Sequence, residues 1–189
     1  MRLASVDSLC ELASKETTGE FAKLSMDYLV DMLNDEIEEV RLNAVNSCKK
    51  LAFRVPVLLE DQLENVLTSC LPDARSDIRH STHGLLANCR LLSRNCLDRT
   101  ILELLKSMSK YPEDQQSIFQ AFRDLGQHHP HFVSALTPKL LSVHPYFDTC
   151  ETDVSDPAYA AKLIMILNAA KERFKICFEI TIRARKITI

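Results

Sequence analysis

Glycine and tryptophan are the residues that this sequence lacks most, with 3 glycines and no tryptophan among 189 residues. Average glycine usage is roughly 7%. So few glycines exclude a glycine-rich phosphate-binding loop and a dinucleotide-binding turn, because both need several glycines at fixed spacing. They also disfavour an all-β fold, since tight hairpin turns need residues with positive φ. Together with only 6% aromatic residues, these absences favour a helical protein.

Long hydrophobic runs and paired cysteines are absent as well. The best apolar run, Leu163–Leu167, has five residues, against the roughly 18 that a membrane span needs. Met1–Asp7 lacks the apolar core of a signal peptide. The 7 cysteines are odd in number and form no Cys-x-x-Cys pair, which is typical of reduced thiols in a cytosolic or nuclear protein. We therefore expect a soluble intracellular protein without a membrane contact.

Charge is distributed unevenly along the chain. The net charge is −3. Residues 171–189 hold six basic and two acidic side chains, a net of +4, which leaves −7 for residues 1–170. An acidic balance over most of the chain does not favour direct binding to RNA or DNA.

A repeat of 38–39 residues organises the sequence. Residues 2–13 and 41–52 are identical at six of twelve positions, at an offset of 39. A third copy follows at an offset of 38, where Leu29, Leu33, Asp35, Val40 and Arg41 match Leu67, Leu71, Asp73, Ile78 and Arg79. This period lies at the short end of the HEAT and armadillo range. It predicts an all-α fold in which HEAT/armadillo-like helix pairs stack into an α-solenoid.

Apolar residues at helical spacing predict the buried face of each helix. We expect three stripes: Phe21, Leu24 and Tyr28 with Leu29 and Met32; Val40, Ala44, Cys48, Leu51 and Ala52; and Leu63, Val66, Leu67, Cys70 and Leu71. Further helices are expected at 97–108, 131–143 and 158–171. Between the first two of these lies another, with Asp114 as its cap, Ile118, Phe119, Phe122 and Leu125 on its core face and Gly126 as its stop.

These helices group into units at about 1–17, 20–54, 60–92, 97–126 and 131–171. The first unit holds one helix only, so we expect the chain to be a piece of a longer array. Residues 172–189 form a basic tail in which apolar and polar residues alternate from Phe174 to Ile182, a pattern typical of a strand. The tail is either a basic arm for RNA or a partner protein, or a divergent end with little selected structure. The mixing of Lys and Arg with Ile and Phe favours the second interpretation.

Two groups of charged residues follow the repeat. Asp35 and Arg41 are six residues apart across one turn, as are Asp73 and Arg79 across the next, and Arg2 occupies the same position as the two arginines. Similarity to HEAT-like repeats implies that such residues pair between neighbouring units as a ladder; the alternative is a turn cap and a solvated arginine. Beside Asp35, the acids Asp31, Glu36, Glu38 and Glu39 predict a solvated acidic ridge that could face a basic partner.

Nothing in the sequence predicts catalysis, a cofactor or a metal. There is no Ser-His-Asp arrangement, Walker motif, or kinase or hydrolase signature. His80 and His83, with Cys89, and the turn histidines His128, His129 and His131 lack the spacing of a zinc motif. Solvated turn histidines are expected instead. The cysteines on the apolar stripes are expected to be small buried hydrophobes: Cys10, Cys48, Cys70 and Cys89.

Four segments carry a resemblance to a known family. Val30–Leu42, Leu102–Pro112, Pro138–Thr149 and Asp156–Lys171 resemble the family of Integrator complex subunit 4, and the similarity extends over about residues 1–171. The turn at 34–41 and the segment His144–Asp148 are more specific than general HEAT patterning. From Glu172 onward the chain is not similar to this family.

The resemblance implies a non-catalytic HEAT-repeat scaffold in the nucleus. The Integrator complex associates with RNA polymerase II and cleaves nascent transcripts, including the 3′ ends of small nuclear RNAs. The implied partners are other Integrator subunits, while the family's contact with the metallo-β-lactamase-type cleavage subunits lies beyond the matched residues. The alternative from another class is a generic HEAT-repeat adaptor in transport or signalling.

Overall fold

A computed structural model describes residues 2–15, 20–52, 57–141 and 155–187, with side chains omitted for Val57 and from residue 175 onward. The chain divides into two compact units, Met1–Ala121 and Phe122–Ile189. The regular elements among the described residues are helices, apart from two paired strands of two residues each. The predicted all-α class is therefore confirmed, and none of the helices among these residues is long and apolar enough to cross a membrane.

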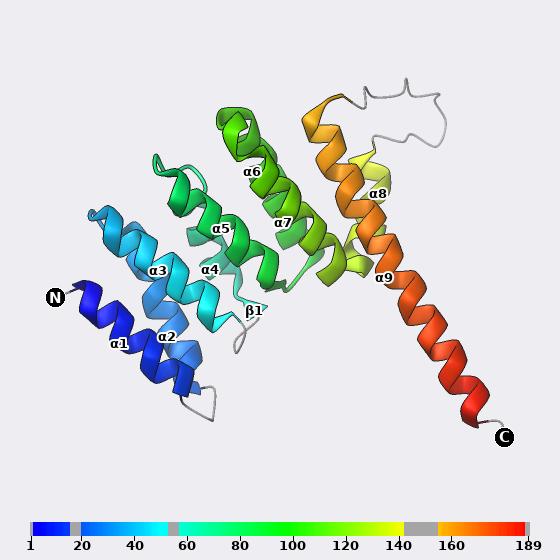
Figure 1. The fold of residues 1–189 in the computed structure, drawn as a ribbon, viewed down its shortest axis with the longest axis horizontal. Helices are drawn as coiled ribbons and strands as arrows, with labels where there is room; N and C mark the ends of the chain where they lie inside the picture. Colours follow the sequence, from blue (N-terminus) through cyan, green and yellow to red (C-terminus); the bar gives the residue numbers. More distant parts are fainter. Residues whose placement is uncertain (1, 16–19, 53–56, 142–154, 188–189) are drawn as a thin grey trace. The chain divides into compact units, whose positions relative to one another are not determined.

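The first unit is a succession of helices joined by short turns (Figure 1). Its elements are α1 (Arg2–Lys15), α2 (Glu20–Asp31), η1 (Met32–Asn34), α3 (Glu38–Leu51), β1 (Val57–Leu58), α4 (Glu60–Asn65), η2 (Val66–Cys70), α5 (Ser76–Asn88), β2 (Arg90–Leu91), α6 (Arg94–Lys110), η3 (Pro112–Asp114) and the first part of α7 (Gln115–His128). The segment η2 is a single π-helical turn that extends α4.

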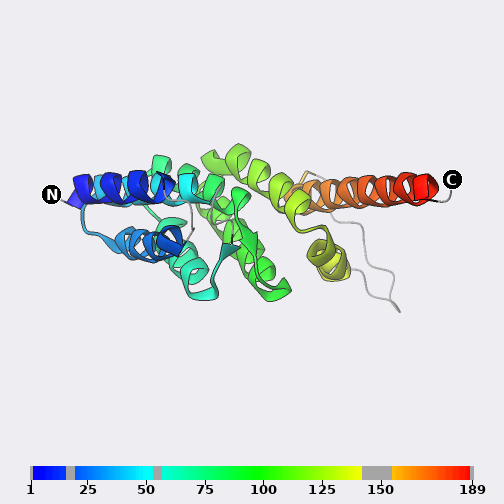
Figure 2. The same cartoon turned by 90° about the horizontal axis from the view of Figure 1, so that it is seen from below.

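Helices of the first unit form two layers. In one layer α3 packs between α1 and α5, and α2 packs against α4 in the other (Figures 1 and 2). In the second layer α6 lies next to α4, as an ion pair between Arg99 of α6 and Glu64 of α4 shows. Consecutive helices are therefore paired and the pairs are stacked, as the repeat predicts.

The core lies between the layers, and its composition follows the apolar stripes with one exception. All residues of the expected stripes in α3 and in α4 with η2 are buried. In α2, however, Leu24 and Tyr28 are 59% and 64% exposed, while Ala22, Met26 and Val30 are buried. Apolar residues surround most of α2, so periodicity could not select a face. Packing of α2 against α3 and α4 buries the face that carries Ala22, Met26 and Val30.

Two segments between helix pairs lie side by side as a minimal parallel sheet. β1 precedes α4 and β2 precedes α6, with Val57 opposite Arg90 and Leu58 opposite Leu91. Two residues are too short for an alternating pattern, so the sequence carried no signal for this pairing.

The second unit contains the end of α7, α8 (Pro130–Leu140) and α9 (Pro157–Ile187). The expected strand within 174–182 is wrong, because α9 continues through these residues to Ile187. Asp156 starts this helix by accepting a hydrogen bond from the Ala158 N–H at 3.0 Å. Once begun, a helix gains one hydrogen bond per added residue.

Gly126 was expected to stop a helix, yet it lies inside α7, which ends at His128. A Cβ at this position would lie 2.4 Å from the main-chain oxygen of Met165 in α9. The glycine therefore allows two helices of the second unit to approach closely, rather than ending one of them. The helix expected at 131–143 is α8, described to Leu140, and the segment His144–Asp148 lies outside the described residues.

Candidate functional site

The turns before α3 and α5 are built around the two aspartates of the repeat. Asp35 Oδ1 accepts a hydrogen bond from the Ile37 N–H at 2.9 Å, and Asp73 Oδ1 accepts one from the Arg75 N–H at 3.0 Å. A carboxylate that binds the backbone two residues ahead closes a turn. In each case the second carboxylate oxygen is left to bind another group.

That second oxygen binds an arginine from the preceding helix pair. Arg2 Nη1 lies 2.8 Å from Asp35 Oδ2, and Arg41 Nε lies 2.8 Å from Asp73 Oδ2. We call these contacts the ladder, and each one joins two successive helix pairs.

The ladder has a further rung that sequence reasoning missed. Arg79 Nε binds Asp114 Oδ2 at 2.5 Å, although Asp114 was expected only to cap α7. The signal was weak because the unit after residue 92 has little identity to the others. Pro72-Asp73 and Pro112-Glu113-Asp114 nevertheless share a carboxylate placed just after a proline that ends a helix, and this similarity could have identified the rung.

Two of the arginines also bind their own turns. Arg41 Nη1 donates to the Asp35 carbonyl oxygen at 2.9 Å, and Arg79 Nη1 donates to that of Asp73 at 3.0 Å. Each guanidinium therefore holds a turn of its own helix pair and a carboxylate of the next. A planar group with several fixed donors is suited to this role.

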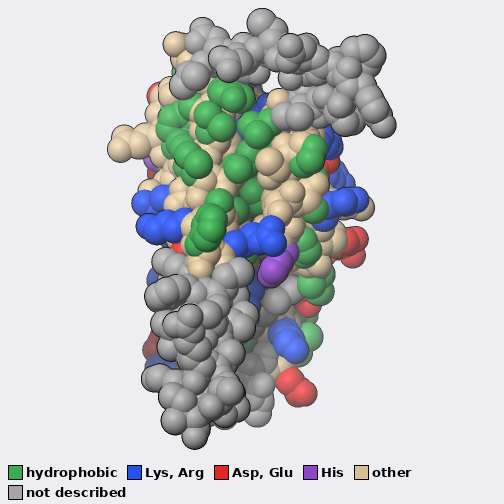
Figure 3. Space-filling model, turned by 90° about the vertical axis from the view of Figure 1, so that its right-hand side faces the viewer, with side chains coloured by type: hydrophobic (Ala, Val, Ile, Leu, Met, Phe, Trp, Pro, Cys, Tyr) green, Lys and Arg blue, Asp and Glu red, His purple; other side chains and the backbone are tan. Residues whose placement is uncertain are grey.

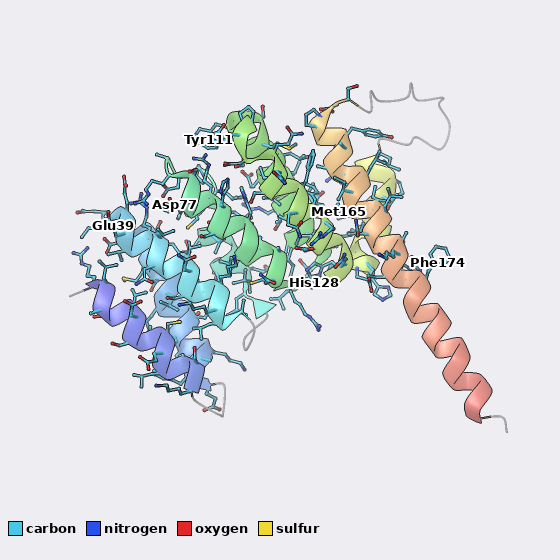
Figure 4. The ribbon with its side chains drawn as sticks, in the orientation of Figure 1. Glu39, Asp77, Tyr111, His128, Met165 and Phe174 are labelled. Carbon is cyan, nitrogen blue, oxygen red and sulfur yellow. The ribbon has the colours of Figure 1, made fainter. Side chains whose placement is uncertain are left out.

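Burial increases along the ladder. The side chains of Arg2, Arg41 and Arg79 are 61%, 18% and 2% exposed. The Arg79 guanidinium also lies 3.7 Å above the centre of the Tyr111 ring, a residue at the end of α6 (Figure 4). Hydrogen bonds to Asp73 and Asp114 raise the pKa of Arg41 and Arg79, respectively, so both remain charged.

Asp114 stays ionised although it is fully buried. Burial by itself raises the pKa of its carboxyl group, but the hydrogen bond and charge of Arg79 and the contact with His80 bring that pKa below its usual value. His80 Nε2 lies 2.8 Å from the second Asp114 oxygen. The carboxylate is thus bound on both oxygens.

The acidic ridge lies where α2 ends and α3 begins, and its four acids are exposed: Asp31, Glu36, Glu38 and Glu39. Glu38 lies 3.5 Å from Arg75 Nη1 of the next turn, and Glu39, labelled in Figure 4, lies 3.9 Å from the same atom. Asp31 and Glu36 instead border an open hollow of about 460 Å³ next to Asp35. Arg2, which binds Asp35, lines the same hollow. One half of the ridge therefore lies beside Arg75, and the other half borders this hollow.

His83 and His129 serve structural contacts, while His128 and His131 are exposed, as expected. His83 is 1% exposed, its Nδ1 lies 2.9 Å from Ser117 Oγ of α7, and burial lowers its pKa to about 4. His129 was expected to be solvated but is buried, with its ring stacked 5.9 Å from that of Phe132. Within the described part of the chain, no three His, Cys, Asp or Glu side chains are grouped as a metal site.

The stripe cysteines are buried, as expected. Burial raises the pKa of the Cys70 and Cys89 thiols to about 12, and that of Cys48 well above its usual value. Thiols of this kind remain protonated near neutral pH and are poor nucleophiles. These three cysteines therefore supply packing rather than chemistry.

Comparison with known proteins finds similarity to Integrator complex subunit 4 from several organisms. The chain is 47% identical over 171 residues to Integrator complex subunit 4 of Xenopus laevis, 45% to that of Homo sapiens and 46% to that of Drosophila melanogaster. Each alignment covers 90% of this chain but only 16–17% of the relative's length. No family model matches the sequence. Over nine-tenths of its length, this stacked-helix chain is therefore similar to one segment of Integrator complex subunit 4.

Proposed function

We propose that the chain acts as a non-catalytic scaffold segment in nuclear RNA processing, of the kind supplied by Integrator complex subunit 4. The observation that carries this proposal is the 45–47% identity over 90% of the chain to that subunit in two vertebrates and an insect. The role would lie in 3′-end cleavage of small nuclear RNAs and in processing of RNA polymerase II transcripts. The partners would be other Integrator subunits, and the compartment would be the nucleus.

The site geometry supports a scaffold more than an enzyme. The buried polar groups described above are engaged in joining helix pairs, and Cys48, Cys70 and Cys89 have raised thiol pKa values. A solenoid offers extended surfaces on which partner proteins can bind. The metallo-β-lactamase-type cleavage subunits would be contacted by regions of the family outside this segment.

Within this role, Asp31 and Glu36 would face a basic partner. They are exposed and border the hollow at the end of α2, whereas Glu38 and Glu39 oppose Arg75. Opposed charges across an interface mainly change association rate and specificity, so this contact should weaken as salt is raised.

Affinity purification tests the proposal. The tagged chain is expressed in cultured cells and its bound proteins are identified by mass spectrometry. Recovery of Integrator subunits is the expected result. Asp31→Lys with Glu36→Lys should reduce that recovery, while the charge-matched control Glu20→Lys with Asp61→Lys, at exposed acids of α2 and α4, should not.

Two outcomes would contradict it. Recovery of transport receptors or phosphatase subunits without Integrator subunits would favour a generic HEAT-repeat adaptor. If circular dichroism shows both variants folded, an equal loss of Integrator subunits with the ridge variant and its control would show that the ridge is not part of the binding surface.

A further inference from the structure

A groove runs between η2 and α6 in the first unit, and it encloses about 230 Å³. Buried side chains form its floor, among them Leu67, Leu71 and Ser107, and exposed side chains form its rim. Pockets for small-molecule ligands usually enclose about 300–1,000 Å³. The groove is smaller than these, so it suits one or two side chains of a protein segment rather than a metabolite.

The groove follows one face of α6. Four residues of this helix line it at positions i, i+3, i+4 and i+7: Glu103, Lys106, Ser107 and Lys110. This spacing keeps the side chains on one face over two helical turns, about 10 Å along the helix axis. An amphipathic helix that lies in a groove presents its anchoring side chains at the same spacing. The length of the groove therefore fits a helix of a partner.

The other wall of the groove is built on an irregular turn. Leu67 and Thr68 belong to the π-helical turn η2, and Leu71 and Pro72 follow it. Single π turns are rare and frequently occur at functional sites. The one π turn among the described helices thus borders this groove.

The equivalent junction one helix pair earlier is bridged by a hydrogen bond. There Ser69 Oγ donates to Asn34 Oδ1 at 2.6 Å. Counted from the aspartates of the ladder, the positions of Ser69 and Asn34 are taken by Lys110 and Pro72 in the later junction. The proline ring has no polar group, so the same side-chain bond cannot form and Lys110 is left at the rim of the groove.

Lys110 carries a charge that a partner can meet. Its Nζ lies 4.9 Å from the centre of the Tyr111 ring, and the ion pairs of the described residues do not include it. Lys106, by contrast, is paired with Glu103 at 2.7 Å. The Tyr111 hydroxyl donates to the Pro72 carbonyl oxygen at 3.1 Å, which holds the ring beside the groove. A carboxylate bound next to Lys110 would gain an opposite charge without displacing an existing ion pair.

Basic side chains also lie among apolar ones on the face of the molecule shown in Figure 3. In the second unit, a smaller hollow of about 100 Å³ between α8 and α9 has Arg173 in its lining. The Arg173 guanidinium already donates to Ser134 Oγ at 2.6 Å. The groove beside α6 is larger and its lysine is not engaged in this way, so it is the better fit for an acidic partner.

We propose that the groove between η2 and α6 binds an acidic amphipathic helix of a partner protein. An apolar side chain of that helix packs on Leu67 and Leu71, and a carboxylate one turn away lies opposite Lys110. The groove shares no residue with the acidic ridge, and its test needs no Integrator subunit. The inference can therefore fail while the proposed function stands.

Fluorescence anisotropy of the full chain with two labelled peptides tests the proposal. The acidic probe is four repeats of Leu-Ala-Ala-Glu, which places leucine and glutamate side by side on a helix, and the neutral probe has Gln in place of each Glu. Lys110→Glu should weaken binding of the acidic probe at least about fivefold and leave that of the neutral probe unchanged. Lys23→Glu, at an exposed lysine of α2, is the matched control and should change neither.

Thr68→Trp tests the apolar part of the groove, because it adds an indole at the exposed rim. It should weaken binding of both probes while circular dichroism shows the helices retained. Unchanged binding of both probes in this variant would contradict the proposal.

Three further results would overturn it. The first is that the acidic probe does not bind, or that Lys110→Glu weakens both probes equally. The second is a single-stranded oligouridylate that competes with the acidic probe and no longer binds Lys110→Glu, because the groove would then bind RNA phosphates. The third is self-association of the chain that Lys110→Glu abolishes, because a second copy would then occupy the groove.

Discussion

Removing the charge of Asp114 should destabilise the protein far more than removing that of Asp35. In Asp114→Asn, the Arg79 guanidinium, 2% exposed, loses the buried carboxylate at 2.5 Å. It keeps only the ion pair with Glu113, a 62% exposed side chain, at 3.1 Å. Breaking a buried ion pair from one side costs about 3–5 kcal/mol. Asp35→Asn keeps an oxygen for the Ile37 N–H and leaves Arg2 in contact with water, so its cost should be much smaller. Asp73→Asn should fall between the two.

Urea unfolding followed by far-UV circular dichroism measures these costs, with linear extrapolation to water. A double-mutant cycle separates the pair from its surroundings. Arg79→Met with Asp114→Leu should cost less than the sum of the single changes, because an apolar pair leaves no unpaired charge. If Asp114→Asn cost no more than Asp35→Asn, burial would not govern the strength of the ladder and the argument from exposure would be refuted.

Three further outcomes are expected. The pKa of His83 is about 4 in the folded protein and 6.5 ordinarily, so between these pH values the unfolded chain binds a proton that the folded chain does not. The free energy of unfolding should therefore fall by about 3 kcal/mol from pH 7 to pH 4. Thermal melts across this range should show a smaller fall in a His83→Gln variant. Gly126→Ala should destabilise the protein by about 1–3 kcal/mol, because the added Cβ meets the Met165 backbone. Gly84→Ala should be neutral or stabilising by up to about 1 kcal/mol, because its Cβ meets only the end of the flexible Lys49 side chain. Equal urea midpoints for the two variants would contradict this. Iodoacetamide at pH 8 should leave Cys48, Cys70 and Cys89 unmodified in the native protein and modify them in urea, as read by peptide mapping. Native-state alkylation of any of them would show that its thiol is accessible and would contradict a packing role.

The helical fold was predictable because several signals agreed. Scarce glycine, a 38–39-residue period and apolar residues such as Val40, Ala44 and Cys48 at helical spacing all indicated paired helices. The period also identified the residues of the ladder, because Asp35 is equivalent to Asp73 and Arg41 is equivalent to Arg79. The third rung was missed because the unit around Asp114 has little identity to the others, and its position after Pro112 was the one signal in the sequence.

Other features depended on interactions that a sequence pattern does not encode. The face that α2 buries is set by α3 and α4, so the larger side chains Leu24 and Tyr28 remain exposed. Alternation in the basic tail suggested a strand, but the backbone there continues the hydrogen bonding of α9. Gly126 looked like a helix stop because its partner, the Met165 backbone, lies far away in the sequence.

The ladder also determines where chain length can vary. The two residues of a rung are separated by 33, 32 and 35 positions in successive pairs, so segments between them accommodate insertions and deletions. Within a turn the separation is six residues both times, because the Arg41 and Arg79 guanidinium groups must reach their own turn's carbonyl oxygens. Adding one residue between Asp73 and Arg79 would detach that arginine from its turn and misplace it relative to Asp114. Length variation in this protein should therefore be confined to the connections outside these two turns.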